Sequence, residues 1–408
     1  MLKRVSLACA TLLLGIHAGL AQQASRTGAN AAEAAPSDAV LRALTLEQQG
    51  NFADALAAWE MVVKAEPRNG RAYAQLGLLE ARQEHYTQAI ADYRKAETLN
   101  PAIPQLKLNL GLAYFKSGEF RSASKIFEAE LAKHPNGPDG ARFTILIGMS
   151  HYGAHEYEAA IPYLKKAAAA DKRNLPLRMN LAHCYLWTKQ LDATLEVYRE
   201  ILDIDPDSAE ADMIAGEALD EKGDKDGAIH QFQAAVLANP KEPNAHFGLA
   251  YLLWTLKRYD EALPEFNAEL QNDPKNYQAM LYLGDLYVRT GTYDKAREML
   301  EKAAPYEKSD PLIYLDMGIV YQEAGDTDRA AQALKETIKL EPESVNAHFR
   351  LGQVYRSMGK KDESKAEFAK ASSLNKKTDQ SVHRRIADAD ARHDRNTEAE
   401  PQATPDKP

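Results

Sequence analysis

The chain has 408 residues, of which 45% are hydrophobic and 27% are charged, and this composition excludes a wholly disordered protein. The formal net charge is −9. This acidic balance argues against nucleic acid or an anionic membrane as the main partner, because both attract basic surfaces. Only two cysteines are present, Cys9 and Cys184, which excludes a framework of disulfides.

Residues 1–21 predict a secretory signal peptide. A cationic start is followed by an apolar run over residues 5–14 and by small residues up to Ala21. The stretch contains His17 and is shorter than the roughly 20 apolar residues of a spanning helix, so we expect cleavage near Ala21 rather than a permanent membrane anchor. Acylation at Cys9 is the weaker alternative, because little of the apolar run precedes it. We therefore expect a periplasmic or secreted protein.

The two segments that flank the central region are predicted to lie outside the folded core. Residues 22–35 are small and polar and are expected to form a flexible linker. Residues 379–408 are expected to form a short polar helix followed by a disordered tail rich in Glu, Pro, Ala and Thr. No later stretch reaches spanning length without charges, so we expect no membrane span after cleavage.

A 34-residue period fills residues 36–378. Position 8 of every frame is small, position 20 is Ala, Ser or Thr, and position 24 is large and apolar. Position 32 is proline in seven frames, and lysine replaces it at Lys172, Lys308 and Lys376. The ten frames, with three extra residues before the fourth, are 36–69, 70–103, 104–137, 141–174, 175–208, 209–242, 243–276, 277–310, 311–344 and 345–378.

These columns predict two helices in each frame. Apolar residues recur at helical spacing around positions 4 to 11 and again around positions 17 to 27. Glycine at position 15 of six frames supplies the turn between the helices, and the proline ends the second helix. Small residues at positions 8 and 20 allow close approach, and the large side chain at position 24 fills the space beside them. Because helices of about 14 residues are marginal alone, each pair must bury its face on the next pair.

Two stretches show the full motif: Leu76-Gly77 with Ala89 and Pro101, and Leu110-Gly111-Tyr114 with Ala123, Phe127 and Pro135. This pattern resembles the tetratricopeptide repeat family over residues 36–378. The resemblance implies an all-α fold, a right-handed α-solenoid of about ten helix-turn-helix repeats. It implies little about a specific function, because such solenoids have many different partners.

In this family, positions 2, 5, 9, 12 and 13 of the first helix line the concave face. Here, basic residues occupy these positions in repeats two to four, apolar and aromatic residues in repeats three to seven, and acidic residues in repeat six. The candidate partner-binding residues are Arg71, Arg82, Lys116 and Arg142; Leu108, Leu112, Phe115, Met149, Tyr152, Met179, His183, Trp187, Phe247, Tyr251 and Trp254; and Glu217 and Asp220.

An apolar and aromatic surface is costly to leave in water and commonly marks an interaction site. We expect this groove to bind an extended or helical segment of another protein, with acidic groups toward repeats two to four and basic groups toward repeat six. The alternative is that some of these side chains pack inward against neighbouring helices. The oligomeric state stays open.

The sequence shows no pattern of catalytic, cofactor-binding or metal-binding residues, so we expect neither an enzyme nor a bound cofactor. His151 and His155 stand four residues apart, but one falls at a core position and the other in the turn, which favours a packed histidine over a metal ligand. His183 and Cys184 are neighbours and point about 100° apart on a helix, so a Cys–His nucleophile is not expected.

Taken together, these features predict an exported scaffold or adaptor that binds another protein through its groove. The alternative is a periplasmic solenoid subunit of a polysaccharide-export, protein-export or outer-membrane assembly complex. A regulatory arm of an enzyme is less favoured. We expect no nucleic acid partner.

Overall fold

The computed structural model describes residues 37–133, 135 and 139–377. The predicted signal peptide (1–21), linker (22–35) and tail (379–408) lie outside these residues. Every regular element in the described part is a helix, and no helix there combines the length and apolar character needed to cross a membrane. The prediction of an all-α solenoid of helix-turn-helix repeats is confirmed.

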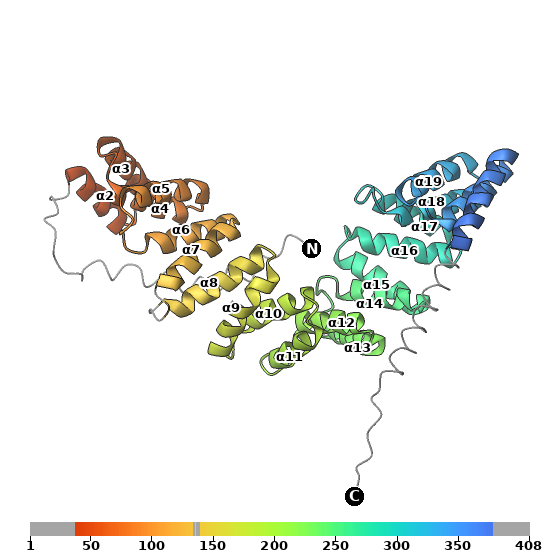
Figure 1. Cartoon of the computed structure of the whole chain (residues 1–408), viewed down its shortest axis with the longest axis horizontal. Coiled ribbons are helices and arrows are strands. Elements are labelled where there is room, and N and C mark those ends of the chain that lie inside the picture. Colours follow the sequence, from red (N-terminus) through yellow and green to blue (C-terminus); the bar gives the residue numbers. More distant parts are fainter. Residues whose placement is uncertain (1–36, 134, 136–138, 378–408) are drawn as a thin grey trace, which may run out of the picture. The chain divides into compact units, whose positions relative to one another are not determined.

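The helices follow one another as the first and second helix of successive repeats (Figure 1). The last described repeat pairs α20 with a helical segment at 361–377. The pairs are α2 (Asp38–Gln48) and α3 (Phe52–Ala65); α4 (Gly70–Arg82) and α5 (Tyr86–Leu99); α6 (Leu106–Ser117) and α7 (Phe120–Lys133); α8 (Gly140–Gly153) and α9 (Tyr157–Ala170); α10 (Leu175–Trp187) and α11 (Leu191–Leu202); α12 (Ala209–Lys222) and α13 (Lys225–Ala238); α14 (Ala245–Thr255) and α15 (Tyr259–Asn272); α16 (Tyr277–Arg289) and α17 (Tyr293–Ala303); α18 (Pro311–Glu323) and α19 (Thr327–Leu340); and α20 (Val345–Ser357) with 361–377.

The turn inside each hairpin depends on one residue in the left-handed region, at position 15 of the repeat. In six repeats this residue is glycine, with φ between 72° and 85°. In the other four it is Glu84, His155, Lys189 or Lys257, with φ between 60° and 64°. A left-handed backbone costs a non-glycine residue about 1 kcal/mol or more. The packing of the two helices therefore imposes this turn even where the sequence does not favour it.

Six of the seven second helices with a proline at position 32 end two residues before it, whereas α11 ends at Leu202, four residues before Pro206. α3 ends at Ala65 before Pro67, and α5 ends at Leu99 before Pro101. α17 has Lys308 at the usual proline position and instead ends at Ala303, two residues before Pro305. This early end leaves the loop 304–310, which is longer than the other connections between repeats.

Gly111 and Phe127 show how closely the paired helices approach. Phe127 on α7 is fully buried, and a Cβ atom added to Gly111 on α6 would lie 2.4 Å from its Cε1 atom. The same relation joins Gly77 to Tyr93, where the added Cβ would lie 2.8 Å from the ring. The small column at position 8 and the large column at position 24 are therefore the two sides of one contact.

The chain forms two compact units, Met1–Gln231 and Phe232–Pro408, and the division falls inside α13. In the first unit, buried apolar residues from α5 to α12 form one continuous cluster. In the second unit, separate clusters join α16 to α18 and α18 to α20. Within each unit the second helix of a hairpin packs against its own first helix and against the first helix of the next hairpin, so the buried clusters run from one hairpin into the next.

We expect Gly111→Ala to destabilise the third repeat, although alanine is the better helix former. The new Cβ must displace the Phe127 ring, and overpacking of this kind costs about 1–3 kcal/mol, against about 1 kcal/mol gained from helix propensity. Hydrogen exchange of the α6 and α7 amides in the full chain measures the effect as faster exchange.

Gly140→Ala is the matched control, because its added Cβ would meet nothing closer than the Pro135 carbonyl oxygen at 3.4 Å. Protection should be kept in this variant. Equal protection in both variants would contradict the close-approach argument.

Candidate functional site

Burial divides the predicted groove residues into three groups. The exposed residues are Arg71, Arg82, Lys116 and Trp187. The half-buried residues are Leu112, Arg142, His183, Glu217, Asp220, Phe247, Tyr251 and Trp254. The buried residues are Leu108, Phe115, Met149, Tyr152 and Met179. For these last five the inward-packing alternative holds, and they are corrected from groove contacts to core residues.

The five buried residues are covered by neighbouring helices of the first unit. The Phe115 ring on α6 meets the Phe120 ring on α7 edge-on, with centroids 5.3 Å apart. Met149 on α8 and Met179 on α10 belong to the same apolar cluster. The concave apolar surface of repeats three to five is therefore smaller than the sequence predicts.

An aromatic cluster remains at the end of α10, formed by Tyr152, Tyr157, His183 and Trp187 and called here the Trp187 cluster. The Trp187 ring stacks on His183 with centroids 5.1 Å apart and an interplanar angle of 12°. It also lies 4.5 Å from the Tyr157 ring and 6.0 Å from the Tyr152 ring. Despite three ring neighbours, Trp187 is 41% exposed.

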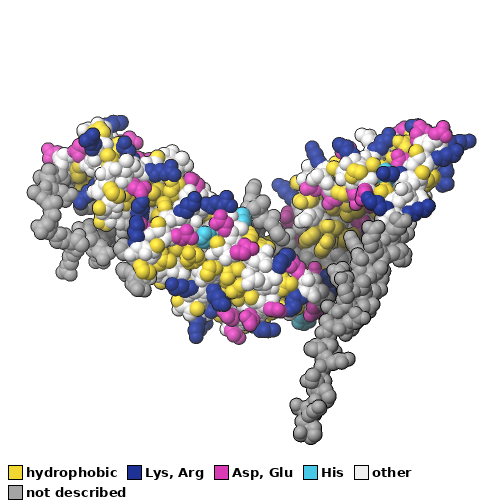
Figure 2. All heavy atoms as spheres, viewed as in Figure 1, with side chains coloured by type: hydrophobic (Ala, Val, Ile, Leu, Met, Phe, Trp, Pro, Cys, Tyr) yellow, Lys and Arg dark blue, Asp and Glu magenta, His cyan; other side chains and the backbone are white. Residues whose placement is uncertain are grey.

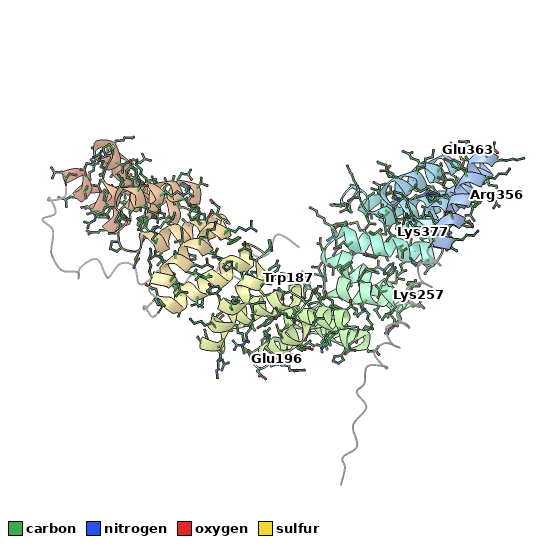
Figure 3. All side chains as sticks on the ribbon, viewed as in Figure 1. Trp187, Glu196, Lys257, Arg356, Glu363 and Lys377 are labelled. Atoms are coloured by element: carbon green, nitrogen blue, oxygen red, sulfur yellow. The ribbon has the colours of Figure 1, made fainter. Side chains whose placement is uncertain are left out.

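The Trp187 cluster lies on the first-helix side of the repeats. Trp187 at the end of α10 and Glu196 on α11 lie on opposite sides of the fifth repeat (Figure 3). Apolar side chains also reach the surface over α8, α9 and α10 (Figure 2). The exposed indole is in contact with three other rings and is therefore not an isolated surface residue.

His183 is neutral in this cluster. Its Nδ1 atom lies 3.3 Å from the Tyr152 hydroxyl, and burial lowers the pKa of His183 to about 4. Stacking on Trp187 therefore brings no positive charge to the surface at neutral pH. The cluster offers a flat, uncharged aromatic face.

Three carboxylates follow on α12, which packs against α10. Glu221 pairs with Lys189 at the end of α10, and Asp220 pairs with Lys225. Glu217 is half-buried, and no hydrogen bond or ion pair to it is found within the described part of the chain. Burial and the like charges of Glu221 and Asp220 raise the pKa of Glu217, against the opposing effect of Lys189. This carboxylate is therefore short of positive partners.

The predicted basic residues come from three different helices. The Arg82 guanidinium at the end of α4 lies over the Phe52 ring, 4.8 Å from its centroid. Lys116 is exposed at the end of α6, and the Nε of Arg142 on α8 is buried without a hydrogen-bond partner. Across residues 37–133, 135 and 139–377, none of these three cations forms an ion pair. Arg82 and Lys116 are exposed, so their charges are available at the surface, and their role in binding stays a prediction.

The second unit carries its own aromatic cluster, formed by Phe247, Tyr251, Trp254 and Tyr282 and called here the Trp254 cluster. Tyr282 on α16 lies 4.9 Å from both the Tyr251 and Trp254 rings of α14. Tyr251 and Phe247 stack with centroids 5.9 Å apart. All four side chains are half-buried, so this cluster is more enclosed than the exposed Trp187 indole.

Asp285 fixes the position of Trp254. Its Oδ2 accepts a hydrogen bond from the indole Nε1 at 2.7 Å and another from the Arg289 Nε at 2.5 Å. The Arg289 guanidinium also lies over the Trp254 ring, 5.5 Å from its centroid. Asp316 is 2% exposed, and its burial together with the nearby charge of Asp285 raises its pKa. The positive charge of Arg289 therefore neutralises the charge of Asp285, and the raised pKa of Asp316 favours its protonated, uncharged form.

Four residues of these clusters were not predicted: Tyr157, Tyr282, Arg289 and Asp316. Arg289 holds position 13 of its repeat, so the positional rule alone could have found it. Tyr282 and Asp316 hold position 6, and Tyr157 is the first residue of a second helix, so the concave positions of the family do not include them.

His151 and Cys184, which were considered above as a possible metal ligand and a possible nucleophile, are both packing residues. The His151 ring lies between two glutamates, with Nδ1 2.8 Å from Glu156 and Nε2 2.9 Å from Glu128, which confirms a packed histidine. Burial raises the pKa of the Cys184 thiol to about 12, so it is not a nucleophile at neutral pH. No group of three or more His, Cys, Asp or Glu side chains suited to a metal ion is found among the residues that were searched, which are the described ones.

The lowered pKa of His183 predicts a pH dependence of stability. The unfolded chain takes up a proton at His183 below about pH 6.5, whereas the folded chain does so only near pH 4. Stability contributed by the neutral ring is therefore complete above pH 6.5 and is lost as the pH falls toward 4, by up to about 3 kcal/mol.

We expect the difference in unfolding free energy between the wild type and His183→Gln to shrink from pH 7 to pH 4.5, measured by urea unfolding. The exposed Met61 supplies the control variant Met61→Ala, which removes no titratable group, so its difference from the wild type should be the same at both pH values. A constant difference for His183→Gln would show that the ring is not buried as a neutral group.

A family model described as tetratricopeptide repeat matches residues 40–104, 108–174, 215–277 and 315–376, which is more than half of the chain. A second model of the same description matches residues 151–218 and 253–315. The peroxisomal targeting signal receptor of Kluyveromyces lactis is 19% identical over 228 residues, which are 54% of this chain and 38% of the receptor. The chain thus spans well under half the length of that relative.

Two solved structures are similar at low identity. A tetratricopeptide repeat protein from Parabacteroides merdae is 20% identical with a TM-score of 0.45, and the match covers 61% of this chain and 97% of that one. The pilF protein of Pseudomonas aeruginosa is 20% identical with a TM-score of 0.47, covering 51% of this chain and 94% of that one. The repeat columns, the helix pairs and the family models agree: the chain belongs to the tetratricopeptide repeat family.

Proposed function

We propose that the protein is an exported scaffold that binds an extended segment of another protein on the first helices of repeats four to six. The observation that carries this proposal is Trp187, a large indole that three rings hold in place and that is still 41% exposed. A rigid, half-covered tryptophan is a typical anchor of protein interfaces. Covering it removes apolar surface from water at about 25 cal/mol per Å².

The charges around the Trp187 cluster define the chemistry of the bound segment. Glu217 and its neighbours on α12 favour a basic group beyond the indole. Lys116 at the end of α6, which is exposed and forms no ion pair within the described part of the chain, favours an acidic group on the other side. The bound segment is therefore expected to carry an apolar anchor between an acidic and a basic residue.

The family supports a binding role and not a catalytic one. Its repeats occur in a relative named peroxisomal targeting signal receptor, which agrees with recognition of a segment of another protein. Cys184 and His151 are engaged in packing, as described above, and no other group in the described clusters has the geometry of a nucleophile and its base. The partner is thus expected to leave the surface chemically unchanged.

Binding at the Trp187 cluster is tested with peptides selected from a displayed random library on the full chain. We expect selected peptides to combine an apolar anchor with a Lys or Arg, and Trp187→Ala to weaken them at least about fivefold, or 1 kcal/mol. Glu217→Gln should weaken the same peptides and reduce the dependence of binding on salt.

Met61→Ala is the control, because Met61 is an exposed apolar side chain on the second helix α3. Its affinities should equal those of the wild type, while all variants keep their helical circular dichroism. Equal affinities for the wild type and Trp187→Ala would contradict the proposed surface.

If the protein is exported, residues 1–21 are removed from the mature chain. The protein purified from the cells that make it is expected to begin at Gln22, because the apolar stretch 5–14 directs secretion and is then removed. Intact-mass measurement of the purified protein decides this. A mass that includes residues 1–21 would contradict cleavage, and a lipid-modified mass beginning at Cys9 would favour acylation instead.

A further inference from the structure

A hollow of about 350 Å³ lies in the second unit. It forms because α17 ends at Ala303 and the chain then takes the long loop 304–310 before α18 begins at Pro311. The first turns of α16 make the opposite wall. The lining residues are Tyr277, Gln278, Leu281, Tyr282, Glu307, Ser309, Asp310 and Pro311.

Two tyrosine rings give the hollow an aromatic wall. Tyr277 stacks on Tyr306 with centroids 6.3 Å apart and an interplanar angle of 11°. The Tyr282 ring contacts the Tyr251 and Trp254 rings, with centroids 4.9 Å apart in each pair. Because neighbouring rings hold both walls, a ligand in the hollow meets preformed aromatic surface.

The charge of the hollow is negative. Glu307 accepts hydrogen bonds from Ser309, with the backbone nitrogen at 2.9 Å, and Asp310 accepts one from the Leu312 nitrogen at 2.9 Å. No described Lys or Arg forms an ion pair with either carboxylate, and the neighbouring Lys308 is exposed. Burial, with Asp310 among the contributing charges, raises the pKa of Tyr282 to about 12. Two acidic residues and two tyrosines therefore line the same hollow.

We propose that this hollow binds the side chain of a lysine or arginine from a partner segment. Its volume is at the lower end of the roughly 300–1,000 Å³ of small-ligand sites, which suits one long side chain. The tyrosine faces attract a cation through their ring quadrupoles. Glu307 and Asp310 then accept charge-assisted hydrogen bonds from the ammonium or guanidinium group. An acidic or phosphorylated segment is excluded by the same two carboxylates.

This proposal goes beyond the Trp187 surface, because the two sites lie in different units and share no residue. Either site can therefore fail without the other. The two sites also require different partner sequences. The hollow requires a lysine or arginine, whereas the Trp187 cluster requires an apolar residue.

The test titrates the full chain with the capped tripeptide acetyl-Gly-Arg-Gly-amide and with its Gln analogue, followed by NMR. We expect the Arg peptide to bind at millimolar concentration, as suits a single anchor worth about 4 kcal/mol, and the Gln peptide to bind at least tenfold more weakly. Glu307→Gln and Asp310→Asn should each weaken the Arg peptide at least fivefold. Asn at position 310 still caps α18, so the fold is kept.

Asp294→Asn is the matched control, because it removes one negative charge from an exposed position on α17 of the same repeat. It should leave the affinity unchanged. Equal binding of the Arg and Gln peptides would overturn the proposal. It would equally be overturned if Asp294→Asn weakened binding as much as Asp310→Asn, or if only Glu217→Gln weakened it, which would place the peptide on α12.

Discussion

The close approach of the two helices in each hairpin, at positions 8 and 24 of the repeat, is the constraint on which the structure depends. At Gly111 there is no room for one additional carbon atom beside the Phe127 ring. The helices are too short to be stable alone, so this contact and the packing of each hairpin on the next replace a conventional core. The left-handed turn at Glu84, His155, Lys189 and Lys257 follows from it, because the paired helices impose a backbone conformation that these residues disfavour.

The same stacking decides which concave side chains are free. A first helix is in contact with its own second helix and with the first helices of its neighbours, so positions 5, 9 and 12 are partly covered wherever a neighbour carries a large residue. Phe115 and Met149 are buried, whereas Trp187 stays 41% exposed although three rings contact it. A concave position alone therefore does not make a side chain available for binding, because packing against neighbouring helices decides whether it stays exposed.

This explains how much the sequence could predict. The division into helix pairs follows from columns at positions 8, 20 and 24 that recur in ten frames. The turn glycine recurs in six frames and the helix-ending proline in seven, so the sequence indicates those features in most repeats and not in all. The candidate site does not repeat, because Tyr157 and Tyr282 join their clusters through contacts between successive repeats and not through a position rule. The burial of Tyr152 could not be predicted for the same reason, since it depends on Tyr157 and Trp187 from two other helices.

The loops between repeats take no part in the helix contacts at positions 8 and 24. One repeat can therefore differ from the next in its loop. Residues at the packing positions of a helix must keep their size, because the contact with the neighbouring helix depends on them. A loop between repeats only has to connect two helix ends, so its sequence and length can vary. At 304–310 the shift of the proline from position 32 to Pro305 ends α17 early, and the added length brings Glu307 and Asp310 beside the Tyr277 and Tyr282 rings. A single displaced proline thus opens space against a helix face that stacking has already made rigid, so a new specificity can arise there without any change to the packed columns.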